Sequence, residues 1–501
     1  MHQNKKFSRV LVANRGEIAL RVMRSCKEMG IETIAVYSDA DREALHVKMA
    51  DFAYHIGPAP SSQSYLKVEK IIEAALALKA DAIHPGYGFL SENAAFAKKV
   101  TEAGIVFIGP SPESIRVMGD KLEAKAAVMN YDIPLVPGTA ESITDITLAK
   151  QKAAEAGYPV LIKASAGGGG KGMRIVEREE DFEDQMERAI SEAKSAFGNG
   201  AVFIEKYITS PKHIEFQIMG DQHGNIVHFF ERECSIQRRH QKVIEEAPSP
   251  VITNEIRKKM GEAAINVAKA CNYYGAGTVE FIVDESLNFY FLEMNTRLQV
   301  EHPVTELITG FDLVKEQIKV AQGEKLGFSQ KDINKTGHAI ELRVYAEDPQ
   351  NNFLPDTGSL DTYNRPQGAG VRVDDGYEQG MPIPIFYDPM IAKLITYGKD
   401  RTEAIDRMLR AIEEYNISGV KTTLPFGSFV LKHESFINGS FTTKFVEQFF
   451  EANLLNSTLS NTEKELAAIL IHLSQENISD NQVVKAKNNN KKVSKWKERL
   501  K

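Results

Sequence analysis

A run of glycines between two strand-like segments constrains this chain more than any other part of its sequence. The run Ala166–Gly172 follows the apolar segment Tyr158–Ala164 and precedes Met173–Val176. Consecutive glycines tolerate positive φ angles and let backbone N–H groups approach phosphate oxygens. A dinucleotide-binding fingerprint opens a helix, and a Walker A loop has Ser or Thr after its lysine, whereas Lys171 is followed by Gly172 here. The pattern predicts a flap over nucleotide phosphates, and a flexible linker is the alternative.

Length and composition narrow the class of protein. With 501 residues the chain is too long for one compact core, which indicates two to four domains. A net charge of -7 gives no reason to expect nucleic acid as a partner. The sequence has no run of about 18 apolar residues, so no membrane span is expected. Because strand-like residues begin at Arg9, we expect no signal or transit peptide and a cytoplasmic location.

Strand and helix patterns alternate over residues 1–115. This rhythm is typical of a parallel sheet with helices on both faces. The expected strands are Val10–Ala13, Thr33–Tyr37, Ala82–His84 and Ile105–Ile108, and the expected helices include Val68–Leu78 and one capped by Ser91. We therefore predict an α/β domain at the start of the chain.

Antiparallel patterns mixed with helices follow, and they predict an α+β organisation. The expected strand pairs are Ile214–Met219 with Ile226–Phe230, Thr278–Val283 with Phe289–Met294, and His338–Ala346 with Tyr387–Tyr397. Residues 451–501 are first helix-patterned and then rich in Lys and Asn. That composition favours a solvated tail or a docking segment over a nucleic-acid binder.

Two carboxylates stand on opposite arms of the second hairpin. If its register centres on Ser286 and Leu287, Glu280 faces Glu293, and like charges directly opposed destabilise a sheet. A hard divalent cation reverses that effect, and magnesium is the usual cation beside nucleotide phosphates. Asn295, on the same strand face as Glu293, adds a neutral oxygen ligand. The spacing alone leaves two solvated surface glutamates open, and a one-residue slip would separate them.

A charged segment comes directly after this hairpin. In an extended chain Arg297, Gln299 and Glu301 project from the same side. A guanidinium beside a carboxylate suits the binding and deprotonation of a small anionic oxyacid. On these residues alone a structural ion pair is favoured. The dense charges of Glu231–Glu246 favour a charged cleft over a solvated face, and Arg343 lies on the polar face of its strand.

Together these pieces closely resemble the biotin carboxylases, members of the ATP-grasp superfamily, from about Arg9 to about Phe450. The matching stretches are Val12–Ala19, His84–Asn93, Gly119–Lys121, the glycine run, Gln237–Lys242 and Glu293–Pro303. The resemblance implies a Rossmann-like N-terminal domain at 1–115, an ATP-grasp domain at 116–330 with a mobile lid at about 135–205, and a mixed α/β C-terminal domain at 331–450. The tail 451–501 lies outside it.

The resemblance also implies a reaction. ATP would phosphorylate bicarbonate to carboxyphosphate, and the carboxyl group would then move to N1 of a biotin on a carrier protein. Two Mg²⁺ or Mn²⁺ ions are the implied cofactors. The implied ATP-binding residues are Lys121, Lys163, Gly168, Gly169, Gly170, Met173, Glu205, Lys206, Ile208, His213, Gln237, His240, Glu280 and Glu293.

The remaining site residues are carried over in the same way. The implied metal ligands are Glu280, Glu293 and Asn295, and bicarbonate is expected at Lys242, Arg297, Gln299 and Val300. Glu301 would be the general base, so that the catalytic set is Glu301, Arg297, Lys242 and Arg343. Biotin would bind near Arg343 and Tyr87.

The partners follow from what the sequence lacks. A biotin attachment signature, Met-Lys-Met after a small residue, is missing, so biotin is expected on a separate biotin carboxyl carrier protein. A carboxyltransferase is also expected on another polypeptide, and the family resemblance suggests a homodimer. In the resembling family, Lys at the position of Lys171 is found in many propionyl- and methylcrotonyl-type carboxylases, whereas many acetyl-CoA and pyruvate types carry Arg. We expect an acyl-CoA carboxylase of acetyl- or propionyl-CoA type, with a two-subunit pyruvate carboxylase as the alternative. Another ATP-grasp ligase and a non-catalytic nucleotide-sensing subunit remain as alternatives.

Overall fold

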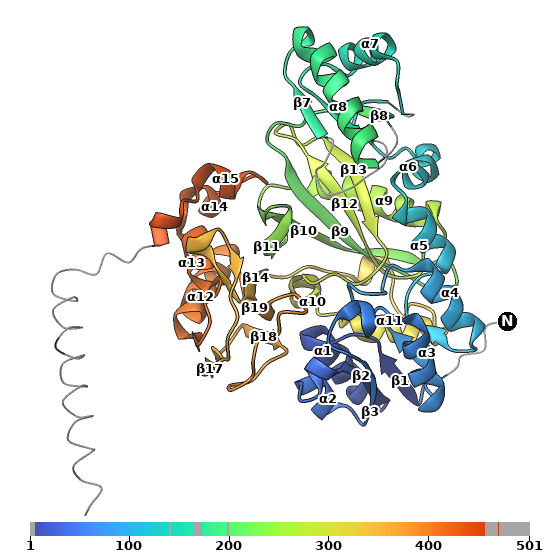
Figure 1. Cartoon of the computed structure of the whole chain (residues 1–501), viewed down its shortest axis with the longest axis vertical. Coiled ribbons are helices and arrows are strands. Elements are labelled where there is room, and N and C mark those ends of the chain that lie inside the picture. Colours follow the sequence, from blue (N-terminus) through green and yellow to red (C-terminus); the bar gives the residue numbers. More distant parts are fainter. Residues whose placement is uncertain (1–5, 140–141, 165–172, 198–199, 456–468, 470–501) are drawn as a thin grey trace, which may run out of the picture. The chain divides into compact units, whose positions relative to one another are not determined.

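The computed structural model describes residues 6–139, 142–164, 173–197, 200–455 and 469 (Figure 1). The chain divides into one compact unit, Met1–Phe450, and a second unit, Glu451–Lys501, whose described residues include the short helix η7 (Ala452–Leu455). Gly168, Gly169, Gly170 and Lys171 lie outside the described residues. None of the described helices combines the length and apolar character that a membrane span requires.

The chain begins with a five-stranded parallel sheet in the order β3-β2-β1-β4-β5, which confirms the predicted α/β fold class. Its strands are β1 (Arg9–Val12), β2 (Glu32–Ser38), β3 (Phe52–Gly57), β4 (Ala82–His84) and β5 (Val106–Phe107), and its main helices are α1 (Gly16–Glu28), α3 (Val68–Ala77) and α4 (Ala94–Glu102). Strand β3 was not expected. The prediction of a cap at Ser91 was wrong, because the side chain of Asn93 accepts the hydrogen bond from Phe96 N at 2.8 Å.

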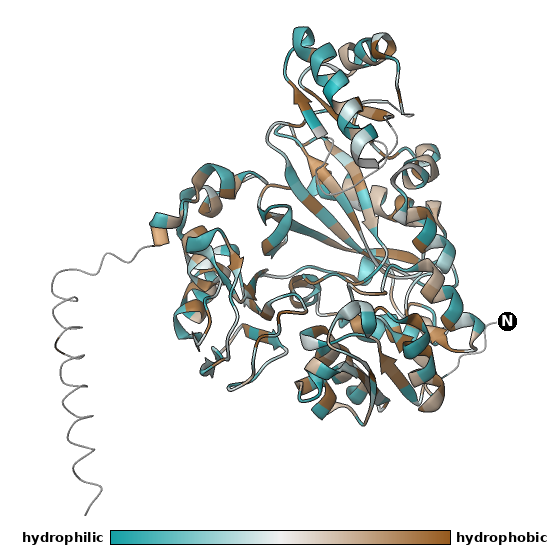
Figure 2. Ribbon diagram, viewed as in Figure 1, coloured by the Kyte–Doolittle hydropathy of each residue, from teal (hydrophilic) through white to brown (hydrophobic). Residues whose placement is uncertain are grey.

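Alternating side chains explain why helices cover both faces of this sheet. Val10 and Val12 pack in one core cluster with residues of α1 and of α11 (Leu313–Ala321). Leu11 lies between them in sequence and packs in the opposite cluster, with residues of α3 and α4. Figure 2 shows the strands of this sheet as brown, hydrophobic elements, whereas the surrounding helices carry both colours.

A second sheet of eight strands runs through the rest of the compact unit, in the order β13-β12-β9-β10-β11-β14-β19-β18. The strands are β9 (Lys212–Gly220), β10 (Ile226–Arg238), β11 (Gln241–Ala247), β12 (Gly275–Val283), β13 (Phe289–Asn295), β14 (His338–Tyr345), β18 (Val371–Asp375) and β19 (Met390–Gly398). Every neighbouring pair is antiparallel, and all three predicted strand pairs form.

Helices cover this sheet where its strands are apolar. Ile214, Phe216 and Ile218 of β9 pack with residues of α9 (Asn254–Ala270). Leu342 of β14 packs in another cluster with residues of α12 (Arg401–Glu414) and α13 (Leu424–Lys432). The opposite face of β14 lies against α10 (His302–Thr309), because Ala339 clusters with Val304 and Ile308.

A small sheet in the order β7-β6-β8 carries the flanks of the glycine run. Strand β6 (Val160–Ala164) pairs antiparallel with β7 (Met173–Val176) and with β8 (Val202–Lys206), beside α7 (Ile146–Ala156) and α8 (Phe182–Phe197). The predicted strands on either side of the glycine run therefore form and pair with each other.

Candidate functional site

Charged side chains form a row across the eight-stranded sheet. The register pairs Glu293 with Glu280 on β13 and β12, Glu280 with Glu215 on β9, and Glu215 with Arg232 on β10. The predicted opposition of Glu280 and Glu293 is present, but the turn centres on Ser286 alone, and a register shift between Phe281 and Glu280 brings the two carboxylates opposite each other. Arg232 belongs to the charged segment Glu231–Glu246 that was predicted to line a cleft, whereas Glu215 was not singled out, although β9 alternates His213, Glu215 and Gln217 with buried apolar residues. That alternation was the available signal that one face of β9 lines a polar site.

Glu280 lies at the centre of this row. Its Oε1 accepts hydrogen bonds from Lys242 Nζ at 2.9 Å, Asn295 Nδ2 at 2.8 Å and Gln299 Nε2 at 2.7 Å. Its Oε2 lies 2.9 Å from His213 Nε2. Burial would raise the pKa of Glu280, but the charges of Lys242 and His213 outweigh it and hold the pKa well below the usual range. Glu280 is therefore a carboxylate at neutral pH.

His213 joins this row to one further polar residue, Gln237. Its Nδ1 lies 3.1 Å from Gln237 Nε2. The carboxylates of Glu280 and Glu215, together with His213, place one ligand atom each within 4.8 Å of one another. Burial lowers the pKa of His213, but the charge of Glu280 outweighs it, so the pKa is raised. The structure thus brings three of the sequence-predicted residues together and adds Glu215 to them.

Glu301 precedes α10 and is only 1% exposed. Its two oxygens accept hydrogen bonds from different cations, Oε1 from Lys242 Nζ at 2.8 Å and Oε2 from Arg343 Nη2 at 2.9 Å. Burial alone would raise the pKa of Glu301, but the charges of Lys242, Arg343 and Arg232 hold it well below its usual range. The carboxylate is therefore available as a proton acceptor at neutral pH.

Lys242 connects Glu301 to the acidic row of Glu280 and Glu215. Besides Glu280 and Glu301, its ammonium donates to Glu215, which is fully buried. Burial would lower the pKa of Lys242, but the three carboxylates raise it well above its usual value. A lysine in such surroundings stays charged and can hold an anion.

Arg343 reaches Glu301 from β14. Its Nε donates to Glu245 Oε1 at 2.6 Å, and its Nη2 donates to Glu301. Burial raises the pKa of Glu245 to about 7, against the opposing charge of Arg343. Glu245 was predicted only as part of the charged segment Glu231–Glu246, without a role of its own. Its side chain comes from β11, so no local sequence spacing could have linked it to Arg343.

The segment after β13 does not stay extended as assumed. The chain bends at Thr296 and Arg297, so the period-two argument fails there. Arg297 donates to Glu92 at 2.8 Å and to Asn295 Oδ1 at 2.9 Å. The cations that contact Glu301 are Lys242 and Arg343 instead.

Gln299 and Val300 lie between the bend and Glu301. Gln299 accepts from Arg232 at 2.7 Å and donates to Glu280. The Val300 carbonyl accepts from Lys393 Nζ at 2.8 Å. Gln299 is thus tied to the acidic row, whereas Val300 is tied to the C-terminal part of the sheet.

The predicted nucleotide residues on the small sheet form their own cluster. Glu205 is buried and pairs with both Lys163 and Lys125. Lys206 points away from that pair, since its Nζ donates to the carbonyls of Gly157 at 2.7 Å and Tyr158 at 3.0 Å.

Other predicted residues have fewer described contacts. Ile208 follows β8, and His240 is exposed in the turn between β10 and β11 with a φ of 66°. The side chains of Lys121 and Met173 lie outside the described part of the chain. The Tyr87 carbonyl accepts from Asn14 at 2.7 Å. Among the hydrogen bonds and ion pairs of the described residues, none joins Tyr87 to Arg343.

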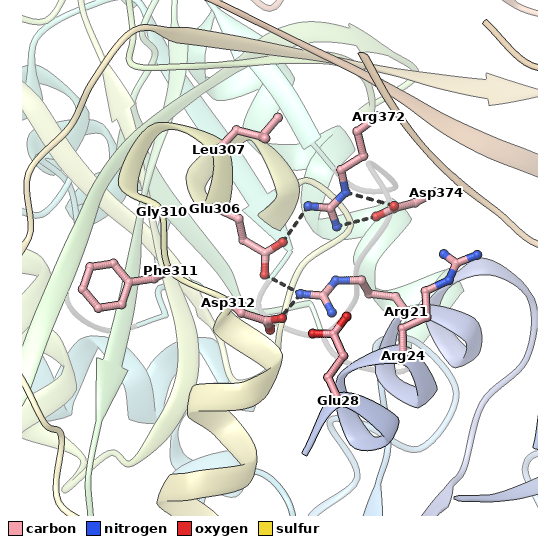
Figure 3. A pocket seen from close by; sticks show the side chains of 10 residues that line it. All are labelled: Arg21, Arg24, Glu28, Glu306, Leu307, Gly310, Phe311, Asp312, Arg372 and Asp374. Atoms are coloured by element: carbon pink, nitrogen blue, oxygen red, sulfur yellow. Dashed lines mark hydrogen bonds and ion pairs between the residues drawn. The ribbon is translucent and has the colours of Figure 1, made fainter. Parts of the chain in front are cut away.

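A pocket of about 360 Å³ lies apart from these residues (Figure 3). In it, Glu306 of α10 accepts from Arg21 at 2.7 Å and from Arg372 at 2.9 Å, and Arg372 also binds Asp374. The pocket therefore contacts the helix that begins after Glu301, but none of the sequence-predicted site residues lines it.

Three family models match the chain. They are described as the biotin carboxylase N-terminal domain, over residues 6–115, the ATP-binding domain of the carbamoyl-phosphate synthase L chain, over residues 120–329, and the biotin carboxylase C-terminal domain, over residues 341–448. Biotin carboxylase 1 of Bacillus subtilis is 53% identical over 88% of this chain and 99% of its own length. A pyruvate carboxylase subunit of Methanothermobacter thermautotrophicus is 54% identical over 88% of this chain and 90% of its own.

Solved structures agree with the sequence matches. The biotin carboxylase domain dimer of Hydrogenobacter thermophilus 2-oxoglutarate carboxylase was solved with MgADP and bicarbonate. It shares 50% sequence identity with the chain and a TM-score of 0.83, over 91% of this chain and 100% of that one. The chain therefore belongs to the biotin carboxylase family of ATP-grasp ligases, and its reaction is the biotin carboxylase step of a biotin-dependent carboxylase.

Proposed function

We propose that the chain uses ATP and bicarbonate to carboxylate a biotin carried by a separate protein, as one subunit of an acyl-CoA carboxylase. The observation that carries this proposal is the placement of Glu301 between Lys242 and Arg343. A buried carboxylate with two cations beside it suits the removal of a proton from a small anion, because the cations bind and acidify the anion while the carboxylate accepts the proton.

The first step is phosphorylation of bicarbonate. Lys242, Arg297, Gln299 and Val300 are the proposed bicarbonate contacts, and Glu301 takes the proton from the bicarbonate hydroxyl. The oxygen that loses this proton attacks the γ-phosphorus of ATP, and ADP leaves with the electron pair of the broken P–O bond. Carboxyphosphate hydrolyses readily, so the proposed lid at about 135–205 has to exclude water while it exists.

The second step is transfer of the carboxyl group. Carboxyphosphate breaks down to carbon dioxide and a phosphate anion, and the phosphate takes the proton from N1 of biotin. The deprotonated N1 then attacks the carbon of carbon dioxide. The guanidinium of Arg343 is proposed to stabilise the negative charge on the biotin ureido oxygen, which requires it to move from Glu301 or to share its donors between both. Tyr87 is proposed to lie near the biotin.

The metal ligands are proposed to be Glu280, Glu293 and Asn295. Two carboxylates opposed on neighbouring strands and an amide oxygen are the kind of donor set that Mg²⁺ prefers. The Asn295 side chain would have to turn for this role, because its Nδ2 donates to Glu280 and its Oδ1 accepts from Arg297. A magnesium ion bound there would neutralise negative charge on the ATP phosphates.

The nucleotide itself is proposed to lie between the small sheet β7-β6-β8 and the eight-stranded sheet. Its contacts are Lys121, Lys163, Gly168, Gly169, Gly170, Met173, Glu205, Lys206, Ile208, His213, Gln237 and His240. The short ion pairs of Glu205 with Lys163 and Lys125 support a nucleotide role for this cluster, because incoming phosphates would compete with Glu205 for the two ammonium groups.

A kinetic assay with free biotin tests the reaction. The purified chain is expected to release ADP in a bicarbonate-dependent manner, and biotin is expected to stimulate that release and to become carboxylated. ADP release that needs another acceptor and ignores biotin would support a different ATP-grasp ligase. No turnover at all would support the non-catalytic alternative.

The carboxyl acceptor is proposed to be acetyl-CoA or propionyl-CoA. A two-subunit pyruvate carboxylase is the second candidate, and the identity to the pyruvate carboxylase subunit of Methanothermobacter thermautotrophicus favours it. The proposed partners are a biotin carboxyl carrier protein and a carboxyltransferase, with the chain itself as a homodimer. Purifying the chain with its bound partners and offering acetyl-CoA, propionyl-CoA and pyruvate in parallel distinguishes the two candidates.

A further inference from the structure

Lys393 is a fully buried lysine that the reaction described above does not use. It lies on β19 directly opposite Arg343 in the register of β14 and β19, with an exposed fraction of 0%. Its shortest contact is the hydrogen bond to the Val300 carbonyl at 2.8 Å. Replacing a buried ion pair by apolar residues is often neutral or stabilising. The stability of the fold alone therefore does not explain why a buried ammonium group lies at this position.

The carboxylates around Lys393 lie farther from its ammonium group than the Val300 carbonyl does. Glu17 Oε2 lies 3.5 Å from its Nζ and Asp374 Oδ2 lies 3.9 Å away. Asp374 is already paired with Arg372 through two hydrogen bonds, at 2.9 and 2.7 Å. Glu341 is a further buried acid, and burial raises its pKa well above the usual value against the opposing charge of Lys393. The ammonium is therefore surrounded by acids, but its closest partner is the backbone of the catalytic segment.

The Val300 carbonyl and the Glu301 N–H belong to one peptide plane, so Lys393 fixes the orientation of the bond that leads into Glu301. The preceding plane is fixed as well, because the Gln299 carbonyl accepts from His302 Nδ1 at 2.8 Å. Burial and the charge of Lys393 hold the pKa of His302 well below its usual value, so the ring is neutral. Among the hydrogen bonds of the described residues, none has the Val300 N–H as its donor.

We propose that Lys393 is a positioning residue for the bicarbonate step. It holds the Val300–Glu301 peptide plane through the Val300 carbonyl, while His302 holds the plane that carries the Val300 N–H, and the two contacts together align the Val300 N–H and the Glu301 carboxylate on the same bound anion. This inference rests on the proposed function, because it takes bicarbonate as the ligand of Val300. A shift of about 1 Å in a reacting group can cost about 100-fold in rate, so the loss of one such hydrogen bond is expected to be measurable.

A double-variant comparison separates positioning from stability. Lys393→Met removes the hydrogen bond but leaves Glu17 without its cation. Glu17→Gln is the matched control, because it removes the acid and keeps the bond to Val300. The combined variant Lys393→Met/Glu17→Gln removes both charges. Thermal midpoints, the KM for bicarbonate, the KM for ATP and the kcat of ADP release are measured for all three and for the unmodified chain.

The variants are expected to differ in one way in the KM for bicarbonate and in another way in thermal stability. Both variants that contain Lys393→Met are expected to raise the KM for bicarbonate by about tenfold or more, with the KM for ATP unchanged. Glu17→Gln alone is expected to keep the KM for bicarbonate within about twofold, since the positioning bond remains. The combined variant is expected to melt at a higher temperature than Lys393→Met alone.

Three outcomes would overturn the proposal. A folded combined variant with an unchanged KM for bicarbonate removes the positioning role. Equal increases in the KM for ATP and for bicarbonate indicate a general distortion of the site. Failure of the combined variant to fold assigns Lys393 to the stability of the fold. If the unmodified chain shows no bicarbonate-dependent ADP release, the proposed function fails instead.

Discussion

Replacing Glu301 by Gln tests the proposed general base with the smallest change in shape. The amide keeps the size of the carboxylate and one acceptor oxygen. It loses the negative charge and cannot take a proton from bicarbonate at neutral pH. Its NH₂ group would also face one of two cations, Lys242 or Arg343, which now lie at 2.8 and 2.9 Å from the two carboxylate oxygens.

The expected fall in kcat/KM for bicarbonate follows from two effects, the loss of the general base and the loss of one hydrogen bond to a cation. General base catalysis by a positioned side chain typically contributes about 10²- to 10⁴-fold. A hydrogen bond to a charged group is worth about 1.5 to 3 kcal/mol, and one of the two is lost here. We therefore expect kcat/KM for bicarbonate to fall by about 10³-fold or more, which corresponds to about 4 kcal/mol or more of transition-state stabilisation.

The assay follows bicarbonate-dependent ADP release and biotin carboxylation in the same preparation. Binding of ATP, measured by calorimetry, is expected to stay within about threefold, since Glu301 contacts none of the residues of the small sheet. Glu245→Gln is the matched control, because Glu245 also binds Arg343 but does not contact Lys242. Near-normal carboxylation of biotin by Glu301→Gln would refute the assignment of the base.

Three further predictions concern other parts of the charged network. Arg343→Ala is expected to reduce biotin carboxylation more than bicarbonate-dependent ADP release, because the guanidinium is assigned to the biotin step. Arg232→Met is expected to lower the free energy of unfolding by about 3 to 5 kcal/mol, because it leaves the buried Glu215 without one of its cations. Burial raises the pKa of Glu17 to about 7, so the folded state holds this proton more tightly than the unfolded chain. The free energy of unfolding therefore falls as the pH rises from about 4.3, the pKa in the unfolded chain, through about 7, the pKa in the folded protein. Glu17→Gln is expected to raise the free energy of unfolding by up to about 3 kcal/mol at pH 8 and to change it little at pH 4.

Each of these predictions has a decisive contrary result. Equal losses of both activities in Arg343→Ala would move the residue into the first step. Arg42→Met is the control for Arg232→Met, because the Arg42 side chain is 60% exposed, and it is expected to change the free energy of unfolding by less than about 0.5 kcal/mol. An equally small change in Arg232→Met, measured by denaturant unfolding, would contradict the buried-charge argument. A stability difference for Glu17→Gln that is the same at pH 4 and pH 8 would exclude ionisation of this carboxyl as its cause.

The strands of the sheets could be predicted because they depend on local pattern. In the second hairpin the turn centres on Ser286, since Val283 pairs with Phe289, and that register continued without a break would place Glu280 opposite Leu292. A register shift between Phe281 and Glu280 brings Glu280 opposite Glu293 instead, and no local pattern indicated that irregularity. The flanks of the glycine run were likewise predicted from the strand patterns beside it, and β6 and β7 pair as expected.

The cation partners of Glu301 could not be predicted from spacing. The period-two argument holds only while a strand continues, and β13 ends at Asn295, so Arg297 turns to Glu92 instead. Lys242 and Arg343 come from β11 and β14, and only the order of strands in the sheet brings them to one carboxylate. The resemblance to a family named both residues, but it did not give their contacts.

The row of acids across the sheet costs stability, and this cost is informative. Directly opposed like charges destabilise neighbouring strands, and three carboxylates lie side by side here, from Glu293 through Glu280 to Glu215. Lys242 and Arg232 offset part of that repulsion, yet well-packed apolar residues would usually stabilise such a position as well or better. A sequence that keeps buried charges against its own stability does so at sites where the charges meet a ligand. The same reasoning applies to Lys393, which is why its contact with Val300, rather than its neighbouring acids, is the contact to test.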